Sequence, residues 1–515
     1  MTNADLSADV FSFFKQTETQ AIIVCAGARN APLVVALKET KDFKIYNFFE
    51  ERSAAFFALG LIKASGKPVA VLTTSGTAAA ELLPAVIEAH YQGLPLIAVT
   101  ADRPKKYRGT GSPQSIDQVG LYSNYVESVY DIDMHSENLQ FKWSLQKPLH
   151  LNVSFDEPLI DRRSANTTKI TFERTTSYIK TAENIDFKYK KPLVILGEIP
   201  LDQRAQVIEF IQKLKAPVYA ESLSHLKVQN EISEQLIQSS ELAKTVFKLN
   251  LCDSVIRIGG VPTLRFWRDL EHGFSHIPVT NYSDLPFTGL SRSSDHYSMS
   301  SLSVTSLSRF ENLKSLQKMD QDLKAAKQRL FDKYPRSEQS FTQKLSEFVN
   351  TDAVYLGNSL PIRNWDEFAS CKSARLNANR GANGIDGQIS AYLGWSENEK
   401  TSYCYVGDLT AMYDLAALGL TSQLNENQRN IVVLNNFGGQ IFKRVFKNDD
   451  FINAHSTQFL HWAKMFNWNY QLITETEKIS QIHAAETQFN IVELQPSAEQ
   501  SNLFWNEWDE LCQPR

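Results

Sequence analysis

GDLTAMYDLAALGL at residues 407–420 and NNFGGQIF at residues 435–442 are the stretches on which the predicted fold depends. A short β-rich run precedes each stretch, at 402–406 and at 431–434. Between these runs, apolar side chains recur at helical spacing on or near one face: Met412, Leu415, Leu418 and Leu420. The pattern predicts a strand, a helix and a second strand, which is the repeating unit of a parallel α/β sheet.

Polar side chains stand just past the carboxyl end of each predicted strand. Asp408 follows the first run and Asn436 follows the second, at the edge where open parallel sheets bind ligands. One carboxylate, one amide oxygen and the Gly438 carbonyl would suit Mg²⁺, with Mn²⁺ as the alternative metal, and leave room for a diphosphate. The helix that begins near Thr410 would point its free N–H groups at the same phosphates. A helix cap at Asp408 and a turn at Asn435 and Asn436 explain the spacing equally well. Other segments must therefore decide between a metal site and a structural role.

The composition is that of an ordinary soluble protein of 515 residues, enough for about two to four domains. A net charge of −5 with scattered lysines and arginines gives no basic surface, so nucleic acid binding is not expected. No apolar run approaches a membrane span, and the N-terminal residues MTNADLSADVFSFF lack a basic start and a cleavage site. We therefore expect a cytoplasmic protein without membrane insertion. The cysteines lack CxxC spacing and predict buried thiols: Cys25, Cys252, Cys371, Cys404 and Cys512.

The alternation of apolar runs predicts three α/β domains, each a doubly wound parallel sheet. In the first, strand-like runs such as AIIVCAG and VAVLTT alternate with helical stretches such as ERSAAFFALGLIKAS and, at 76–91, GTAAAELLPAVIEAHY. A polar segment at 162–191 predicts a linker, and a helix with the sequence DQDLKAAKQRLFDKY connects the second region to the last. The predicted domains span residues 1–180, 190–325 and 340–515.

Four segments resemble, in the same order, one family of thiamine diphosphate enzymes: TSGTAAAELLPAVIEAHYQGLPLIAVTADRP, GNSLPIRNWDEF, NRGANGIDG, and GDLTAMYDLAALGL with NNFGGQIF. This family is the synthase of menaquinone biosynthesis that makes 2-succinyl-5-enolpyruvyl-6-hydroxy-3-cyclohexene-1-carboxylate (SEPHCHC). The GD…NN pair is common to thiamine diphosphate decarboxylases and their relatives, whereas NRGANGIDG together with NNFGGQIF is much more specific. The resemblance covers the first and last predicted domains and is weak in the middle one. It implies a pyrimidine-binding, a middle and a diphosphate-binding domain, in that order.

The resemblance implies a decarboxylating carboligase, which is a transferase. With thiamine diphosphate and Mg²⁺, 2-oxoglutarate would lose CO2, and the remaining succinyl semialdehyde unit would add to isochorismate to give SEPHCHC. Relatives build each site from two chains, so a homodimer or a homotetramer is also implied. Asp408, Asn436 and Gly438 are the implied metal ligands. The implied cofactor-binding stretch comprises Gly407, Asp408, Leu409, Thr410, Asn436 and Gly438.

Glu51, in FEERSAAFFALG, is the candidate catalytic carboxylate. Thiamine catalysis needs a carboxylate that hydrogen-bonds the aminopyrimidine ring and so helps the cofactor to lose its C2 proton. Glu51 lies where a predicted strand meets a helix, which is a natural position for a site residue. Its neighbour Glu50 could be confused with it, and helix capping is an alternative role for a glutamate at a helix start. The register against the family motif favours Glu51.

Three arginines in motif segments match substrate-binding positions of the family: Arg29, Arg363 and Arg380. Both implied substrates are dicarboxylates, and planar guanidinium groups suit carboxylates held in a partly dry pocket. A single arginine would more often be structural, but three in motif loops that follow strands favour the site. Arg265 stands where relatives commonly carry lysine, and Ala28 stands where the family often has serine, so both depart from the family pattern.

Other family positions place side chains around the cofactor and the reaction intermediate. Gln114 matches a glutamine that contacts the intermediate, and Ile385 matches the apolar residue wedged between the two cofactor rings. Ile441 and Phe442 would lie beside the cofactor and wall the isochorismate ring. Two polar residues would line the cofactor or the adjacent carboxylate: Asn358 and Ser359.

Two alternatives remain open from the sequence. One is another thiamine diphosphate enzyme, such as an acetohydroxyacid synthase or a 2-oxoacid decarboxylase, although the set of arginines argues against pyruvate as the substrate. The other is a non-catalytic homologue that binds nucleotide-like ligands for regulation or assembly. The presence of Glu51, Asp408 and Asn436 argues against that second alternative.

Overall fold

The computed structural model describes residues 1–164, 170–176, 179, 181, 191–303, 313–349, 352–370, 375–446, 448–482 and 488–512. Within these residues, the strands form three six-stranded sheets and one two-stranded sheet. Every strand pair with a described register is parallel. The expectation of several parallel α/β sheets is therefore confirmed.

The chain forms two compact units, and each unit is made of segments that are not consecutive in the sequence. Unit 1 contains Met1–Ser177, Asn379–Lys400 and Thr410–Arg429. Unit 2 contains Tyr178–Ala378, Thr401–Leu409 and Asn430–Arg515. Two short segments from the last third of the chain therefore belong with the first sheet. The predicted domain boundaries stay predictions.

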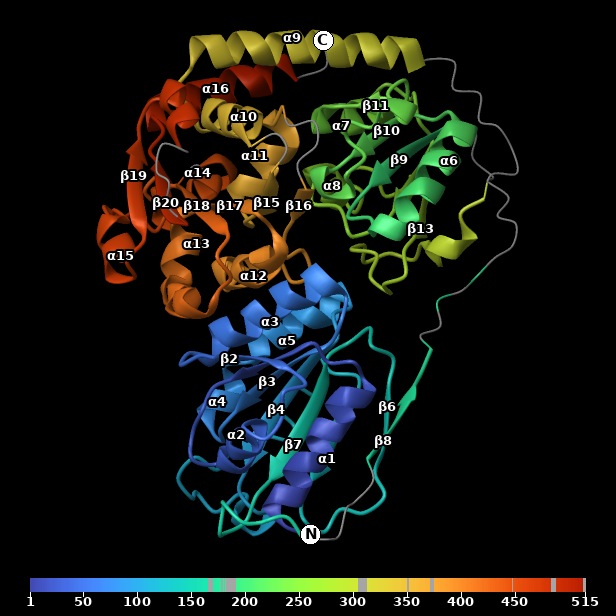
Figure 1. The fold of residues 1–515 in the computed structure, drawn as a ribbon. Coiled ribbons are helices and arrows are strands. Elements are labelled where there is room, and N and C mark those ends of the chain that lie inside the picture. The colour runs from blue at the N-terminus through green and yellow to red at the C-terminus, as the bar shows by residue number, and fades with distance from the viewer. Residues whose placement is uncertain are drawn as a thin grey trace. The chain divides into compact units, whose positions relative to one another are not determined.

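The first sheet, in unit 1, has the strand order β2-β1-β3-β4-β7-β5, and Figure 1 labels its strands β2, β3, β4 and β7. The strands are β1 Ala21–Val24, β2 Lys44–Asn47, β3 Val69–Thr73, β4 Leu96–Asp102, β5 Val129–Ile132 and β7 Leu149–Ser154, while β6 Gln140–Trp143 pairs with β8 Thr171–Arg174. The helices are α1 Asn3–Gln16, α2 Ala31–Leu37, α3 Glu51–Ser65, α4 Thr77–Ala80, α5 Leu83–Gln92 and the 3-10 turn η1 Lys105–Tyr107. Apolar side chains of α1 and α2 share a core with alternate residues of β1, β3 and β4, so these helices cover one face. Helix α3 contacts β1, β3 and β4, and α5 contacts β4.

A later helix, α12 (Gln388–Trp395), packs along α3 within unit 1. A Cβ on Gly60 of α3 would lie 2.0 Å from the Ala391 carbonyl oxygen, and one on Gly394 of α12 would lie 2.2 Å from the Phe57 carbonyl oxygen. The two backbones can approach this closely only because each helix has a glycine at the contact. The position of α3 thus depends on a segment from the far end of the chain.

The middle sheet, in unit 2, has the order β11-β10-β9-β12-β13-β14. The strands are β9 Pro192–Leu196, β10 Val218–Ala220, β11 Leu236–Ile237, β12 Ser254–Ile258, β13 Val279–Tyr282 and β14 Asp295–Tyr297. The helices and 3-10 turns are η2 Leu201–Gln203, α6 Arg204–Leu214, η3 Ser222–Ser224, η4 Asn230–Ile232, α7 Ser240–Lys248, α8 Arg265–Asp269, η5 Met299–Ser301 and α9 Leu313–Lys333. Side chains of α6 form a core with one face of the sheet. Side chains of α7 and α8 form a second core with the other face.

The third sheet, also in unit 2, has the order β16-β15-β17-β18-β20-β19. The strands are β15 Ala353–Leu356, β16 Arg375–Asn377, β17 Thr401–Gly407, β18 Gln428–Leu434, β19 Asn469–Ile473 and β20 Phe489–Leu494. The helices and 3-10 turns are α10 Glu338–Phe348, α11 Leu360–Phe368, α14 Gln440–Phe446, η8 Asp449–Phe451, α15 Leu460–Met465, η9 Thr476–Gln481 and α16 Ala498–Leu511, while η6 Ser396–Asn398 belongs to unit 1 and contacts α3 and α12 there. Strands β17 and β18 are neighbours, as the opening motif predicts, so their carboxyl ends lie side by side.

The connection between β17 and β18 differs from the single helix expected from the sequence. It consists of a six-residue helix, α13 (Asp408–Tyr413), followed by a 3-10 helix, η7 (Leu415–Gln423). Asp414 separates the two because its backbone leaves the helical region, with φ −126° and ψ 33°. The expected common face is also wrong in part, since Leu415 is exposed whereas Leu418 and Leu420 are buried.

Four further expectations concern a helix, the cysteines, the linker and membrane spans. The helical stretch expected at 76–91 is split into α4 and α5, and Pro84 in the first turn of α5 explains the break, because proline cannot continue a helix that precedes it. Cys25, Cys252 and Cys404 are buried thiols, Cys512 is partly buried, and Cys371 lies outside the described residues. Part of the linker expected at 162–191 also lies outside them. Among the described helices, none combines the length and apolar character needed to span a membrane.

Candidate active site

Asp408, Asn436 and Gly438 lie at the carboxyl edge of the third sheet. Asp408 follows β17, and the other two follow the neighbouring strand β18. The Gly438 backbone N–H donates to Asp408 Oδ2 at 2.9 Å. Gly438 has a φ of 138°, and a Cβ there would lie 2.6 Å from the Ile452 carbonyl oxygen, so this close approach requires glycine. The structure brings together the three residues that the sequence singles out as metal ligands.

Asp408 is a buried carboxylate with several hydrogen-bond donors around it. Its Oδ1 accepts the Leu409 N–H at 2.6 Å, and His455 Nε2 lies 3.2 Å from Oδ2. His455 Nδ1 accepts the Thr457 N–H, so a neutral imidazole carries its proton on the nitrogen that faces Asp408. Burial raises the pKa of Asp408, and the N–H groups of Gly438 and Leu409 oppose that rise. The Leu409 N–H is thus used within the protein rather than offered to a phosphate.

The two adjacent asparagines have different partners. Asn435 is fully buried, donates to Glu493 Oε1 at 2.8 Å and accepts the Phe437 N–H at 3.2 Å, so both ends of its amide hold the turn together. Asn436 donates from Nδ2 to Glu338 Oε1 at 2.8 Å. The remaining polar atom of that amide is the oxygen Oδ1. The geometry gives Asn435 a structural role and supports Asn436 as the candidate ligand.

The donor set fits a magnesium ion. It offers a carboxylate from Asp408, an amide oxygen from Asn436 and a carbonyl oxygen from Gly438, all of them hard ligands. Among the residues that the structure describes, no three side chains of His, Cys, Asp or Glu gather as metal ligands, so a metal would rely on this mixed set. Burial raises the pKa of Glu338 to about 7, and the charge of Asp408 adds to the rise. A divalent cation would relieve the repulsion between these two carboxylates.

Glu50 and Glu51 have different tasks at the start of α3. The Glu50 side chain accepts the N–H groups of Arg52 at 3.2 Å and Ser53 at 2.9 Å, which makes Glu50 the N-cap. Glu51 is the first residue of the helix. Burial raises the pKa of Glu51, and the charges of Glu50 and Glu81 add to the effect. The capping alternative therefore belongs to Glu50, and the carboxyl of Glu51 has the raised pKa that suits acid–base chemistry.

Asp414 ties the start of α3 to α12 within unit 1. Its carboxylate accepts the hydroxyl of Ser53 at 3.1 Å, and both the N–H and the hydroxyl of Ser390 at 2.7 and 2.8 Å. Burial raises the pKa of Asp414 to about 6, although these donors and the nearby Arg52 oppose the rise. Ser53 lies two residues after Glu51, so the contacts fix the helical turn that carries the candidate catalytic carboxylate.

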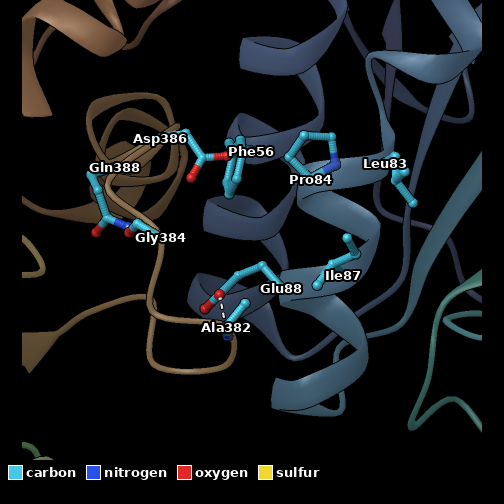
Figure 2. A pocket seen from close by; sticks show the side chains of 9 residues that line it. All are labelled: Phe56, Leu83, Pro84, Ile87, Glu88, Ala382, Gly384, Asp386 and Gln388. Carbon is cyan, nitrogen blue, oxygen red and sulfur yellow. Dashed lines mark hydrogen bonds between the residues drawn. The ribbon is translucent and has the colours of Figure 1, made fainter.

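The loop that carries Arg380 and Ile385 is held by Glu88 on α5. The two oxygens of Glu88 accept the N–H groups of Gly381 and Ala382 at 2.8 and 2.7 Å, and Figure 2 shows the side chain reaching from its helix to the loop. Arg380 and Ile385 are both partly buried. A cavity of about 250 Å³ lies beside this contact and is lined by Phe56, Leu83, Pro84, Ile87, Glu88, Ala382, Gly384, Asp386 and Gln388 (Figure 2).

A further group of residues lies at the carboxyl edge of the first sheet. Arg29 follows β1 in a loop, as expected, and its Nη1 donates to the Phe155 carbonyl at 3.2 Å. Burial lowers the pKa of Arg29, and the positive charge of Arg103 adds to that effect. Arg103 follows β4, and its Nε donates to the Pro113 carbonyl at 2.9 Å, next to Gln114 in the chain. Arg29 and Gln114 thus share one sheet edge with Arg103.

Two of the expected site residues have left-handed backbone conformations. Gln114 has a φ of 55° and Ser359 a φ of 74°, although neither is glycine. Gln114 sits over Gly76, where a Cβ would lie 3.2 Å from the Gln114 Cα. Ser359 is the N-cap of α11, directly after the buried Asn358.

Arg363 does not lie in a loop, and that expectation was wrong. It is inside α11, where its Nη1 donates to the Ser359 carbonyl at 2.8 Å. Pro361 in the first turn lets the helix begin soon after β15, because its fixed φ already suits a helix. Arg265 is the first residue of α8, and its side chain is 71% exposed, with Nε 3.7 Å from Asp269 Oδ1.

The remaining expected residues lie in or beside α13 and α14. Ile441 is partly buried in α14, whereas Phe442 is 41% exposed and stacks on Phe446 with ring centroids 6.1 Å apart. Gly407 ends β17, and Thr410 is buried in α13. The roles of these side chains toward cofactor and substrate stay predictions.

Sequence reasoning missed five residues that hold the candidate site: Glu88, Arg103, Glu338, Asp414 and His455. Arg103 carries the same signal as Arg29, because it is an arginine directly after a predicted strand. The other four carry no such signal, since each one acts on a residue that is distant in the sequence.

Known proteins are similar in sequence to this chain over nearly its whole length. Residues 4–121 match the family described as "Thiamine pyrophosphate enzyme, N-terminal TPP binding domain". The chain is 46% identical to the 2-succinyl-5-enolpyruvyl-6-hydroxy-3-cyclohexene-1-carboxylate synthase of Bdellovibrio bacteriovorus, over 99% of both chains. It is 36% identical to the synthase of the same name from Akkermansia muciniphila, over 93% of both chains, and 31% identical to that of Lysinibacillus sphaericus, over 90% of both. The chain therefore belongs to the SEPHCHC synthase family of thiamine diphosphate enzymes.

Proposed function

We propose that this protein decarboxylates 2-oxoglutarate and adds the resulting succinyl semialdehyde unit to isochorismate, which yields SEPHCHC and CO2 in menaquinone biosynthesis. Thiamine diphosphate is the cofactor, and Mg²⁺ or Mn²⁺ is the proposed metal. One observation supports the proposal most. In a chain of this family, Asp408 Oδ2 accepts the Gly438 N–H at the ends of two adjacent parallel strands, with Asn436 two residues away.

The metal would bind to Asp408, Asn436 and the Gly438 carbonyl, and would hold the diphosphate of the cofactor. Few protein ligands are needed, because Mg²⁺ usually completes its shell with phosphate oxygens and water. Gly407, Leu409 and Thr410 flank the metal in sequence. We therefore expect the protein to bind the metal and the diphosphate of the cofactor together.

Thiamine diphosphate, when bound, supplies the electron sink for decarboxylation and carbon–carbon bond formation. Glu51 would accept and return a proton at the aminopyrimidine ring, a role that suits its raised pKa. Arg29, Arg363 and Arg380 would pair with the carboxylates of the two substrates. Fixing both dicarboxylates in this way lowers the barrier through orientation rather than through a further protein base.

We also propose that the protein works as a homodimer or homotetramer. Glu51 belongs to unit 1, whereas Asp408 and Asn436 belong to unit 2. In the family resemblance, the glutamate and the diphosphate site of one active centre come from two chains. A complete site would then need two copies of this chain.

A coupled assay with the purified full-length protein tests the function. Loss of isochorismate and release of CO2 would be followed with 2-oxoglutarate, with and without thiamine diphosphate and MgCl2. We expect both signals in equal amounts and only with all components. Release of CO2 without loss of isochorismate, or equal turnover of pyruvate, would instead identify another thiamine diphosphate decarboxylase or carboligase.

A further inference from the structure

Glu338 is a buried carboxylate whose partner is unusual. It is 3% exposed, and among the described residues no lysine or arginine forms an ion pair with it. Its Oε1 instead accepts Nδ2 of Asn436 at 2.8 Å. A glutamate is seldom this deeply buried unless a cation pairs with it, so the position of Glu338 calls for an explanation.

Helix capping does not explain Glu338. It is the first residue of α10, but the cap of that helix is Ser337, whose hydroxyl accepts the Ser340 N–H at 3.2 Å. The backbone N–H of Glu338 donates to the Ser501 hydroxyl at 3.0 Å and does not need the side chain. The helix start is therefore satisfied by other groups.

The contact with Asn436 decides which way its amide points. The carboxyl oxygen Oε1 accepts from the NH2 end of the amide, so the oxygen end of the amide faces away from Glu338. With Nδ2 toward Glu338, Oδ1 is the atom left to act as a ligand. The reversed amide would present an NH2 group, which cannot bind a metal ion.

We propose that Glu338 is a positioning residue, which orients the amide of Asn436 so that its oxygen ligates the metal. The proposal rests on the proposed metal site at Asp408, Asn436 and Gly438. Residues behind a metal ligand typically change metal affinity about 10- to 100-fold when they are replaced. Glu338 acts through Asn436, to which its side chain is hydrogen-bonded.

The test measures how much MgCl2 is needed for half-maximal binding of thiamine diphosphate to the full-length protein, by calorimetry or tryptophan fluorescence. We expect Glu338→Ala to raise this concentration about tenfold or more. Glu338→Gln should raise it less, because a glutamine oxygen can still accept from Asn436. The matched control is Ser337→Ala, which removes the cap of the same helix. It should lower the Tm without shifting the Mg²⁺ requirement.

A double-mutant cycle separates orientation from simple charge attraction. In the Asn436→Ala background, there is no amide left to orient, so Glu338→Ala should cause no further change in the Mg²⁺ requirement. If the two effects add in full, Glu338 acts by its charge alone and the proposal is overturned. The same conclusion follows if Glu338→Ala leaves the Mg²⁺ requirement at the wild-type value.

Asp408→Ala distinguishes failure of this inference from failure of the proposed site. If Asp408→Ala removes cofactor binding while Glu338→Ala does not weaken it, the metal site stands and only the positioning role is wrong. If Asp408→Ala binds Mg²⁺ and thiamine diphosphate as the wild type does, the metal site itself is wrong, and the positioning role is wrong with it.

Discussion

The two halves of the candidate site are built in different ways. The metal half joins residues only 30 positions apart, Asp408 and Gly438, through the ends of two neighbouring strands. The Glu51 half is held by Asp414, which is 361 residues from Ser53, and by Glu88, which is 293 residues from Gly381. Neighbouring strands bring the first half together, with Glu338 and His455 as more distant supports, whereas the second depends mainly on distant segments that must dock. Damage to the metal half should therefore remove cofactor binding, and damage to the Glu51 half should spare it.

Asp408→Ala should have the largest effect on that difference. It removes the only anionic ligand of the proposed metal, so thiamine diphosphate affinity should fall by about a hundredfold or more at ordinary magnesium concentrations. Calorimetry with thiamine diphosphate and MgCl2 measures this loss, and EDTA should reproduce it in the wild type. Asp450→Ala, which removes an exposed carboxylate from the 3-10 helix η8, is the matched control. Unchanged affinity in Asp408→Ala would exclude the assigned site.

Glu51→Gln should abolish turnover while the cofactor still binds. Loss of a proton-transferring group typically costs about 10²- to 10⁴-fold in rate. Glu50→Ala is its neighbour-matched control, because it removes the N-cap and should cost about 1 kcal/mol of stability while it keeps most of the turnover. The comparison of kcat and Tm for the two variants checks this division. Equal loss of kcat in both would show that the assignment of roles is wrong.

Arg380→Ala and Arg363→Ala should each reduce turnover and leave thiamine diphosphate affinity nearly intact. Loss of one charge-assisted pair costs about 1.5 to 3 kcal/mol, which corresponds to a rate loss of about 10- to 100-fold. Steady-state kinetics with 2-oxoglutarate and isochorismate varied in turn would show which substrate each arginine holds. Wild-type kinetics with both substrates would return that arginine to a structural role.

The Glu51 half should also show a pH signature from Asp414. Burial raises the pKa of this carboxyl from 3.8 to about 6, so ionisation is disfavoured in the folded state. The contribution of Asp414 to the free energy of unfolding is complete below about pH 4 and is lost as the pH rises through about 6. Relative to Asp414→Asn, the wild type should lose about 3 kcal/mol of stability between pH 4 and pH 7. Urea unfolding of both proteins across this range tests the sign, and a constant difference would contradict it.

The sequence signals for the metal half are local, and the structure brings the residues that carry them to one sheet edge. Asp408, Asn436 and Gly438 each follow a recognisable strand, and neighbouring parallel strands present such residues at one edge. The three sheets follow from the same alternation of apolar runs. The break between α13 and η7 could not be predicted, because Asp414 turns its carboxylate toward Ser53 and Ser390, which no local pattern reveals.

The residues that support the site are the part that the sequence conceals. Glu88 and Glu338 look like ordinary helical glutamates, and only the fold shows that one holds a loop and the other faces an asparagine. The sequence predicts a loop at Arg363, whereas the structure places it in α11. That helix begins at Leu360, directly after Ser359, and no local sequence pattern reveals the left-handed backbone of Ser359. Contacts between segments that are distant in the sequence, rather than weak local propensity, are the reason why these residues could not be predicted.

Complementation tests the central claim most directly, which is that Glu51 and Asp408 serve one site supplied by two chains. Glu51→Gln and Asp408→Ala should each be folded and inactive alone. In a mixed dimer, one site would carry both lesions and the other would carry none, so random pairing of equal amounts should restore roughly a quarter of wild-type activity. A verified heterodimer with no activity, formed from two folded and inactive parents, would contradict the account.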